Sequence, residues 1–311
     1  NLTTVTTITA TDQDTGDNLT YSLSGTDHSK FDFNASTGAL SFISAPDFET
    51  PTDVGEGNTY VVTITVTDDG SLFDSQTFTV TVENANEAPV ISSDGGLSTA
   101  SLDLPENLTT VTTVTATDLD DPTVLSYSTT GGADRTEFVI DTITGDLTFV
   151  SPPDFEAPTD AGADNSYEVE VTVTDDGSGF LADAQMITVN VLNANESPVI
   201  TSLDGNASSS WSMDENNVSV TTVTATDLDA GTTFTYTTTG GADQHRFDVN
   251  RTTGVLKFKS FPDYEIPIDG GSDNTYEVEV TVTDDGTPAY SDAQIITIFH
   301  LLLILSQAFI P

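Results

Sequence analysis

The chain repeats itself three times at long and nearly equal intervals, and this period limits the folds that it can adopt. The hexapeptide Thr-(Val/Ile)-Thr-Ala-Thr-Asp ends at Asp12, Asp118 and Asp227, so the period is about 107 residues. Solenoid units are about 20 to 50 residues long, so each of these longer repeats is predicted to be a domain that folds by itself. The predicted bounds are 1–88 for a first repeat that lacks its beginning, 89–197 and 198–298 for two further repeats, and 299–311 for an apolar tail.

Within each repeat the apolar residues recur with a period of two. From Tyr167 to Val173, apolar side chains alternate with Glu and Thr, a pattern typical of a half-buried strand. No helix longer than a turn or two is indicated. About seven short strands per 100 residues, rich in Thr and Val, predict an all-β chain of three tandem Greek-key β-sandwich domains. Further strands are predicted at 111–117, 124–128, 138–140, 146–150 and 185–192.

Two bridging segments and the tail are less regular. Segments 88–103 and 197–213 are rich in Gly and Ser, and part of each is predicted to be a loop or a flexible leading strand. The apolar stretch at 299–310 is too short to span a bilayer, which takes about 17 to 25 residues. A frameshift or truncation, a final strand with an apolar extension, and a short membrane-associating segment each fit this tail.

Acidic residues dominate the charge of the chain. The 311 residues include 50 Asp and Glu but only 6 Lys and Arg, so the formal net charge is −44. Such a surface repels polyanions, which excludes nucleic acid and anionic membrane as partners. It also strains a compact fold by self-repulsion unless cations relieve it. The chain has no Cys, which excludes disulfides, thiolate metal sites and Cys nucleophiles.

The sequence carries no motif typical of an enzyme. His28, His245 and His300 lack the spacing of a zinc protease motif, and there is no serine nucleophile motif, phosphate loop or dinucleotide fingerprint. Paired carboxylates could serve a glycosidase, but the same pairs recur in three repeats without an insertion that would form a cleft. We therefore predict that the chain is not an enzyme.

The acidic residues instead form motifs at fixed offsets, located at turns. An Asp-x-Asp motif places two carboxylates on one side of an extended backbone, where they can grip a hard cation. An Asp-aromatic-Glu motif has the same geometry, with its ring directed toward the core, and an Asn-Ala-Asn-Glu segment closes the first two repeats. The motifs are Asp12 to Asp14, Asp118 to Asp120 and Asp227 to Asp229; Asp47 to Glu49, Asp154 to Glu156 and Asp263 to Glu265; and Asn84 to Glu87 and Asn193 to Glu196.

Together with Glu106, these motifs supply about seven oxygen ligands at each junction between repeats. An all-oxygen set favours Ca²⁺ over Zn²⁺ or Cu²⁺. A solvated acidic turn would explain one Asp-x-Asp, and an Asn-rich linker would explain the Asn residues, but neither explains the same motifs at both junctions. The sequence thus predicts calcium as the bound ion.

With these motifs, nearly the whole chain resembles tandem cadherin repeats, in particular the Thr-rich repeats of large bacterial surface proteins. Cadherin repeats build a calcium cluster between consecutive domains from Pro-Glu-Asn, Asp-Arg-Glu, Asp-x-Asp, a late-strand Asp and an Asp-x-Asn-Asp-Asn-x-Pro linker. Between repeats one and two, the resemblance implies the ligands Asp47, Glu49, Asn84, Asn86, Glu87, Asp118, Asp120 and Asp175. Between repeats two and three, it implies Glu106, Asp154, Glu156, Asn193, Asn195, Glu196, Asp227, Asp229 and Asp284.

The chain departs from the family pattern in three places. Each linker is one residue shorter, with Asn at the leading Asp and Glu at the inner Asp, so fewer or weaker ions are expected. Asp214 replaces the Pro ahead of Glu215, which is expected to serve a third junction. The tail replaces the linker that would close the third repeat.

The resemblance implies a segment of a secreted or cell-surface adhesin, with an outer-membrane-associated parent protein, whose junctions are stiffened by Ca²⁺. The predicted partners are calcium, the neighbouring repeats and an adhesive partner, protein or glycan, that the sequence does not identify. Homophilic adhesion is a property of the animal family that is not carried over to this chain. Two alternatives remain, namely a calcium-independent acidic stalk and a carbohydrate-binding sandwich module.

Overall fold

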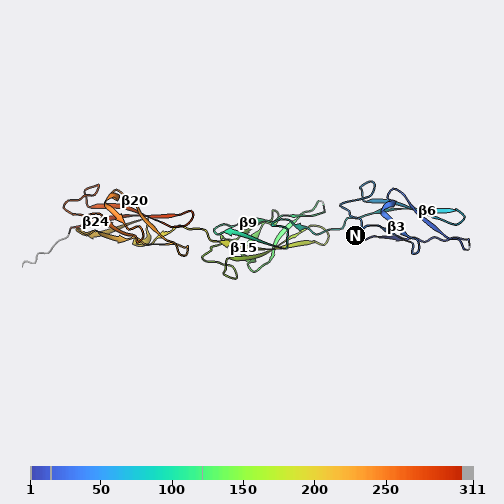
Figure 1. Ribbon diagram of the computed structural model, residues 1–311, viewed down its shortest axis with the longest axis horizontal. Coiled ribbons are helices and arrows are strands. Elements are labelled where there is room, and N and C mark those ends of the chain that lie inside the picture. The colour runs from blue at the N-terminus through green and yellow to red at the C-terminus, as the bar shows by residue number, and fades with distance from the viewer. Residues whose placement is uncertain (1, 15, 121, 303–311) are drawn as a thin grey trace, which may run out of the picture. The chain divides into compact units, whose positions relative to one another are not determined.

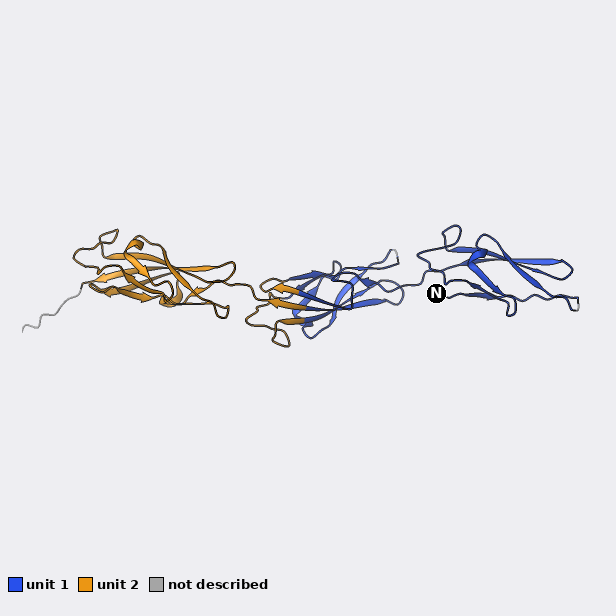
Figure 2. Ribbon diagram, viewed as in Figure 1, with its two compact units in different colours: residues 1–102, 110–150, 168–188 blue, residues 103–109, 151–167, 189–311 orange. Residues whose placement is uncertain are grey.

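The computed structural model describes residues 2–14, 16–120 and 122–302, which form β-strands joined by loops and short 3₁₀ turns (Figure 1). The chain divides into two compact units (Figure 2). Unit 1 comprises residues 1–102, 110–150 and 168–188, and unit 2 comprises residues 103–109, 151–167 and 189–311. The predicted all-β class is confirmed.

Unit 1 contains the first copy of the repeat, which folds as two small antiparallel sheets. One sheet has the order β2-β5-β6, and the other has the order β1-β4-β3. Tyr60 lies opposite Val80 where β5 pairs with β6. The elements are β1 (Thr4–Thr7), β2 (Thr20–Ser24), η1 (His28–Lys30), β3 (Phe31–Asn34), β4 (Ala39–Phe42), β5 (Thr59–Thr67) and β6 (Phe73–Thr81).

The second copy of the repeat follows the same plan. Strand β11 pairs antiparallel with β14, with Ser126 opposite Thr174, while β12, β13 and β9 form a second sheet. The elements are β7 (Val90–Ile91), β8 (Thr99–Pro105), β9 (Thr110–Thr113), β10 (Ala116–Thr117), β11 (Ser126–Gly131), η2 (Arg135–Glu137), β12 (Phe138–Ile140), β13 (Asp146–Phe149), β14 (Ser166–Thr174) and β15 (Ala182–Leu192).

Unit 2 contains the third copy, in which a four-stranded sheet of order β17-β24-β23-β20 faces a three-stranded sheet of order β18-β22-β21. Strand β17 is parallel to β24, and Trp211 lies opposite Ile298 in this pair. The elements are β16 (Val199–Ile200), η3 (Leu203–Gly205), β17 (Ser208–Asp214), β18 (Ser219–Thr222), β19 (Ala225–Thr226), β20 (Thr235–Gly240), η4 (Gln244–Arg246), β21 (Phe247–Val249), β22 (Val255–Phe258), β23 (Thr275–Thr283) and β24 (Ser291–Leu301).

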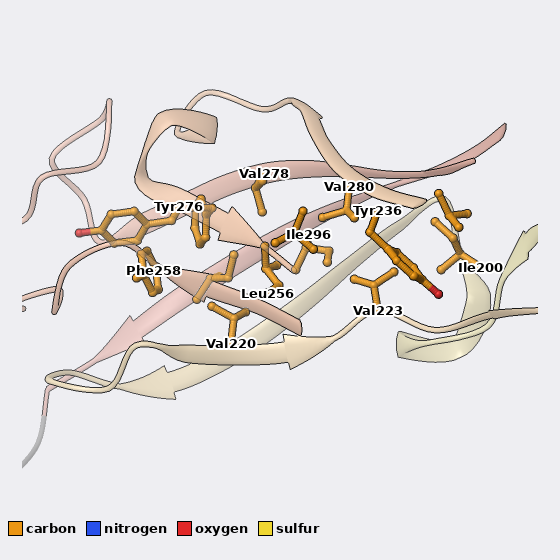
Figure 3. Packing of buried hydrophobic residues seen from close by; sticks show 14 of the residues in the cluster. Ile200, Val220, Val223, Tyr236, Leu256, Phe258, Tyr276, Val278, Val280 and Ile296 are labelled. Atoms are coloured by element: carbon orange, nitrogen blue, oxygen red, sulfur yellow. The ribbon is translucent and has the colours of Figure 1, made fainter. Parts of the chain in front are cut away.

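The core of the third copy lies between its two sheets (Figure 3). Tyr276, Val278 and Val280 of β23 are fully buried, and the residues between them are half-buried. Leu256 of β22 and Ile296 of β24 meet them from the other strands and are also fully buried. The period of two in the sequence therefore marks the face of each strand that enters the core.

The predicted strands agree with the observed ones apart from their ends. The strand predicted at 138–140 is β12, and the strand predicted at 185–192 lies within β15. The strand predicted at 111–117 is interrupted and forms β9 and β10, while the one predicted at 124–128 begins two residues later as β11. The bridging segments contain the leading strands β7, β8, β16 and β17.

The third copy extends three residues beyond its predicted end at residue 298, because β24 continues through Leu301. His300 is 3% exposed, and its ring lies 6.0 Å from Phe258 and 5.8 Å from Tyr276 between ring centres. Burial lowers the pKa of His300. Residues 303–311 of the predicted tail lie outside the described residues. No helix in the described ranges has the length and hydrophobicity required to cross a membrane.

Candidate metal centre

Carboxylates from the first repeat, the linker and the second repeat meet within unit 1. Oxygen atoms of Glu49, Glu87 and Asp120 lie within 4.8 Å of one another, and all three residues are half-buried. The linker reaches the second repeat through Asn84, whose Nδ2 donates to Asp120 Oδ1 at 2.8 Å, and through the Glu87 N–H, which donates to Asp120 Oδ2 at 2.9 Å. Asn86 Nδ2 donates to Asp175 Oδ2 at 2.8 Å.

The corresponding residues of unit 2 form two overlapping triads. Oxygen atoms of Glu106, Asp154 and Glu156 lie within 4.8 Å of one another, as do those of Glu156, Glu196 and Asp229, so Glu156 belongs to both groups. Glu106 is 3% exposed, and its carboxylate accepts hydrogen bonds from the Phe155 and Ala194 N–H groups at 2.8 and 2.9 Å. Glu106 therefore fixes the Asp-aromatic-Glu turn and the linker at the same point.

Turn geometry orients the paired carboxylates. Asp154 Oδ1 accepts the N–H groups of Glu156 and Ala157, each at 3.0 Å, and Asp227 Oδ1 accepts the Asp229 N–H at 3.0 Å. These hydrogen bonds use one oxygen of each Asp, so the turn does not occupy the other oxygen. The same bonds recur in the first repeat at Asp47 and in the second at Asp118.

Among the residues that the structure describes, six buried carboxylate oxygens at the two junctions lack a hydrogen-bond partner. They occupy the same three positions at each junction, because Glu49, Glu87 and Asp118 correspond by motif to Glu156, Glu196 and Asp227. Leaving a buried acceptor unsatisfied costs about 1 to 3 kcal/mol, and more for a charged group. The six atoms are Glu49 Oε1, Glu87 Oε2, Asp118 Oδ2, Glu156 Oε2, Glu196 Oε2 and Asp227 Oδ2.

The electrostatics of these carboxylates favour a bound cation. Burial, followed by the charges of Glu106, Asp229 and Glu156, raises the pKa of Glu196 to about 7. Burial and then the charge of Glu49 raise the pKa of Glu87, and burial and then Glu106 raise the pKa of Glu156. A cation at this position would favour the charged forms.

The residues present fit a hard divalent cation. The candidate metal clusters in the described ranges consist of Asp and Glu, without His. Carboxylate oxygens with neighbouring Asn side chains are typical ligands of Ca²⁺, whereas Zn²⁺ and Cu²⁺ prefer nitrogen or sulfur. The unsatisfied oxygens and the raised pKa values therefore agree with the sequence prediction of calcium.

The structure does not bring every predicted ligand into these triads. Asp47, Asp118 and Asp227 lie outside the triads, and Asn193 is exposed at the start of its linker. Asp175 and Asp284 contact the linker amides of Asn86 and Asn195. The assignment of individual ligands stays a prediction.

Two further acidic clusters lie in the first and third repeats. Asp12, Asp17 and Asp68 gather in the first repeat, and Glu215, Asp263 and Glu265 gather in the third. Glu215 corresponds to Glu106, and its carboxylate accepts the Tyr264 N–H at 3.2 Å.

A residue that supports the site, but had no assigned role from sequence, is the Asn of the repeated Asn-(Thr/Ser)-Tyr triplet. Asn58, Asn165 and Asn274 have φ angles of 62°, 64° and 66°. Each donates from Nδ2 to the carbonyl of the aromatic residue in the Asp-aromatic-Glu turn, at 2.8 to 3.0 Å. The signal was visible as a repeated Asn before a Tyr, because Asn tolerates left-handed backbone.

Buried aspartates are a second feature that sequence reasoning missed. Asp27, Asp134 and Asp243 are 1 to 4% exposed and occupy equivalent positions. Asp27 accepts the Val54 and Val61 N–H groups at 2.7 and 2.8 Å. Burial pushes the pKa of Asp27 upward, but these backbone donors outweigh it and the pKa is lowered. The equivalent acids Asp134 and Asp243 also accept backbone N–H groups, so these acids stabilise loop structure.

Two-sheet β domains in tandem, with an acidic cluster where one repeat meets the next, define the class of the chain as tandem β-sandwich repeats. Comparison with known families identifies the class more closely. The Cadherin domain profile matches residues 100–192 and 209–299. The chain belongs to the cadherin family, whose repeats serve adhesion and are not enzymes.

Known relatives support this assignment. The chain is 32% identical to Cadherin-23 of Rattus norvegicus over 292 residues, which cover 90% of the chain and 8% of that protein. It is 28% identical to Protocadherin Fat 1 of Homo sapiens over 299 residues, covering 94% of the chain and 6% of that protein. The chain thus spans less than a tenth of the length of these relatives.

Solved structures share the fold. Extracellular cadherin domains 1–5 of Protocadherin Gamma B2 match with a TM-score of 0.54 and 22% identity, covering 96% of this chain and 56% of that one. Domains EC22-24 of mouse Cadherin-23 match with a TM-score of 0.50 and 21% identity, covering 97% and 92%. These relatives are animal proteins, so they confirm tandem cadherin repeats but give no support to the predicted bacterial type.

Proposed function

We propose that this chain is a calcium-binding segment of an extracellular adhesive protein, in which Ca²⁺ rigidifies the junctions between repeats. The observation that carries the proposal is the set of buried carboxylate oxygens without partners at equivalent positions of both junctions. Membership of the cadherin family supports the same conclusion. We also propose the repeat bounds 1–88, 89–197 and 198–298, the last lengthened through Leu301 by the extent of β24, and the full ligand sets given above.

The mechanism follows from the position of the acids. Glu49 belongs to the first repeat, Glu87 to the linker and Asp120 to the second repeat, so mutual repulsion of the three carboxylates drives the segments apart. A bound Ca²⁺ supplies the positive charge that converts this repulsion into coordination. The residues then hold the linker and the two repeats in one geometry, which allows the array to carry distal binding domains.

The affinity of the site should match its compartment. Calcium modules of extracellular proteins bind with dissociation constants on the order of 10⁻⁴ to 10⁻³ M. The junctions would therefore fill outside the cell, where free calcium is abundant. We propose an extracellular or cell-surface location; a bacterial origin and an outer-membrane parent stay predictions without support from the comparisons. The adhesive partner is not assigned.

Thermal unfolding of the full chain tests the proposal. We expect the Tm in excess EDTA to rise on adding CaCl₂ but not on adding MgCl₂ or NaCl at the same ionic strength. When the free ion reaches one hundred times its dissociation constant, each site adds about 2.7 kcal/mol of stability. The rise in Tm on adding CaCl₂ is called the calcium increment. The Asp227→Asn/Asp229→Asn variant should lose the part of this increment that comes from the second junction.

The matched control is Asp32→Asn/Asp204→Asn, which removes two acids away from the junctions and should keep the full increment. If CaCl₂ raises the Tm no more than the matched salts, the acidic-stalk alternative is correct. Saturable binding to a glycan array in EDTA would instead favour the carbohydrate-binding alternative.

A further inference from the structure

The linker between repeats one and two is attached to the second repeat by groups that need no metal. Asn84, Asn86 and the Glu87 N–H donate to Asp120 and Asp175 at 2.8 to 2.9 Å. Hydrogen bonds from neutral donors to carboxylates are strong and form without a cation. The linker therefore has its own means of holding the repeat that follows it.

Gly177 leaves the space that the Asn86 side chain occupies in this attachment. It lies in the turn after Asp175, whose Oδ1 accepts the Gly177 N–H at 3.0 Å. The φ angle of Gly177 lies outside the left-handed region, so backbone conformation does not require a glycine there. A Cβ at this position would overlap the side-chain amide of Asn86. The Asn86 amide occupies the space that a Cβ would need, which explains why residue 177 is a glycine.

The second junction repeats the arrangement in unit 2. Asn195 Nδ2 lies 3.1 Å from Asp284 Oδ2 and 2.9 Å from the Pro288 carbonyl, and it can donate to both. A Cβ at Gly286 would overlap the Asn195 amide, and Gly286 also lies outside the left-handed region. The Glu196 N–H donates to Asp229 Oδ2 at 2.9 Å. The Asn contact with the late-strand Asp, the close approach of the Asn amide to a glycine and the Glu N–H contact recur at both junctions, so chance is an inadequate explanation.

The first repeat supplies an internal comparison. Its turn carries the same Thr-Asp-Asp-Gly sequence, ending at Gly70. There the nearest atom to a Cβ is Asp68 Oδ1 of the same turn, at 3.3 Å. Gly70 thus shares the turn sequence of Gly177 and Gly286 and provides a control position for substitutions in this turn.

We propose that Gly177 and Gly286 are positioning residues that seat Asn86 and Asn195, so that each linker stays docked on the following repeat without metal. On the upstream side of the first junction, Glu49 faces Glu87, and these like charges repel. Bending of the metal-free first junction is therefore concentrated between repeat one and the linker. This inference concerns the metal-free state and rests on the proposed function only for the role of Ca²⁺ in fixing the upstream side.

Distance measurements between two spin labels test the proposal on the full chain, which has no native Cys. One labelled protein carries Ala85→Cys and Ser128→Cys, spanning the linker and repeat two; the other carries Ser75→Cys and Ala85→Cys, spanning repeat one and the linker. All three positions are exposed. In excess EDTA we expect a narrow distance distribution for the 85–128 pair and a broad one for the 75–85 pair.

Variants of Gly177 and Asn86 test this contact directly. Gly177→Ala should broaden the 85–128 distribution in EDTA, whereas Gly70→Ala should leave it unchanged. Asn86→Asp removes the amide donor and places a charge beside Asp175, so it should broaden the distribution in EDTA and recover the narrow one in CaCl₂. Such recovery would distinguish a positioning role from misfolding. Asn190→Asp is the matched control, because Asn190 donates to Asp103 at 2.8 Å in unit 2, outside the unit that contains the first linker.

The proposal is overturned if the distance distribution of the 85–128 pair in EDTA is as broad as that of the 75–85 pair. It is also overturned if the 85–128 distribution stays narrow in Gly177→Ala and Asn86→Asp. The proposed function has a separate readout. If CaCl₂ fails to narrow the distance distribution of the 75–85 pair, the proposal of calcium rigidification is wrong. The distributions in EDTA still decide whether the linker is docked on the second repeat.

Discussion

Glu196 shows how one side chain combines burial, charge and metal affinity. Its carboxylate lies in a triad with Glu156 and Asp229, and Asn107 Nδ2 donates to its Oε1 at 2.9 Å. One hydrogen bond does not offset the loss of water and the negative charges of Glu106, Asp229 and Glu156, so the pKa of Glu196 rises to about 7. In the unfolded chain the pKa returns to the ordinary value of about 4.3. The metal-free folded protein therefore binds a proton that the unfolded chain releases, and its stability falls as pH rises through about 7.

Calcium binding at the second junction should have the opposite pH dependence. A ligand must be ionised to bind, so the affinity should be weaker at pH 6 than at pH 8, and binding at pH 6 should release on the order of one proton from Glu196. Isothermal titration calorimetry in buffers with different ionisation enthalpies measures this release. Glu196→Gln should abolish it, while Glu168→Gln, at an exposed position of β14, should not. An equal release from Glu196→Gln and the wild type would assign the proton to another group.

At the scale of the strand, stability depends on which face a residue occupies. Ile295 and Ile296 are neighbours in β24, yet Ile295 is 36% exposed and Ile296 is fully buried between the sheets of the third repeat. Truncation of a buried Ile removes its apolar contacts and leaves a cavity, whereas truncation of the exposed neighbour removes far fewer contacts.

We expect Ile296→Ala to lower the free energy of unfolding of the third repeat by about 2 to 5 kcal/mol. Ile295→Ala is the matched control and should have a clearly smaller effect. Urea unfolding in saturating CaCl₂ measures both variants against the wild type. Equal losses would mean that β24 does not present alternate faces to the core.

The strands and the acidic motifs could be predicted because their signals are local. Alternation from Tyr167 to Val173 identifies a strand without knowledge of its partner, and the recurrence of Asp-x-Asp identifies ligands by residue type. The parallel pairing of β17 with β24 could not be predicted, because it joins a Ser-rich segment at the start of the repeat to a strand at its end. The contact of Gly177 with Asn86 is similarly remote in sequence, and a lone Gly in a turn carries no trace of it.

For the whole molecule, the dominant physical quantity is the net charge of −44. Repulsion among exposed acids acts in the folded state and is screened by salt, with a screening length of about 10 Å at 0.1 M. Because folding brings the acids closer together, screening favours the compact state.

We therefore expect the Tm of the EDTA-treated protein to rise steadily as NaCl is increased from about 0.01 to 0.5 M, a range over which the screening length falls several-fold. The calcium increment should shrink over the same range, because salt weakens the attraction of acids for the ion. Differential scanning calorimetry measures both quantities. A Tm that falls with added NaCl would show that attractive ion pairs outweigh repulsion.

The pairing of Trp211 with Ile298 gives the molecule a natural optical reporter. Trp211 is the single Trp of the chain, and it is 41% exposed in β17, whereas Tyr60, Tyr167 and Tyr276 are buried in the three successive copies. Light absorbed only by Trp therefore reports the melting of the third repeat, while tyrosine absorbance reports all three. Following both signals in one unlabelled sample would reveal the order in which the repeats unfold.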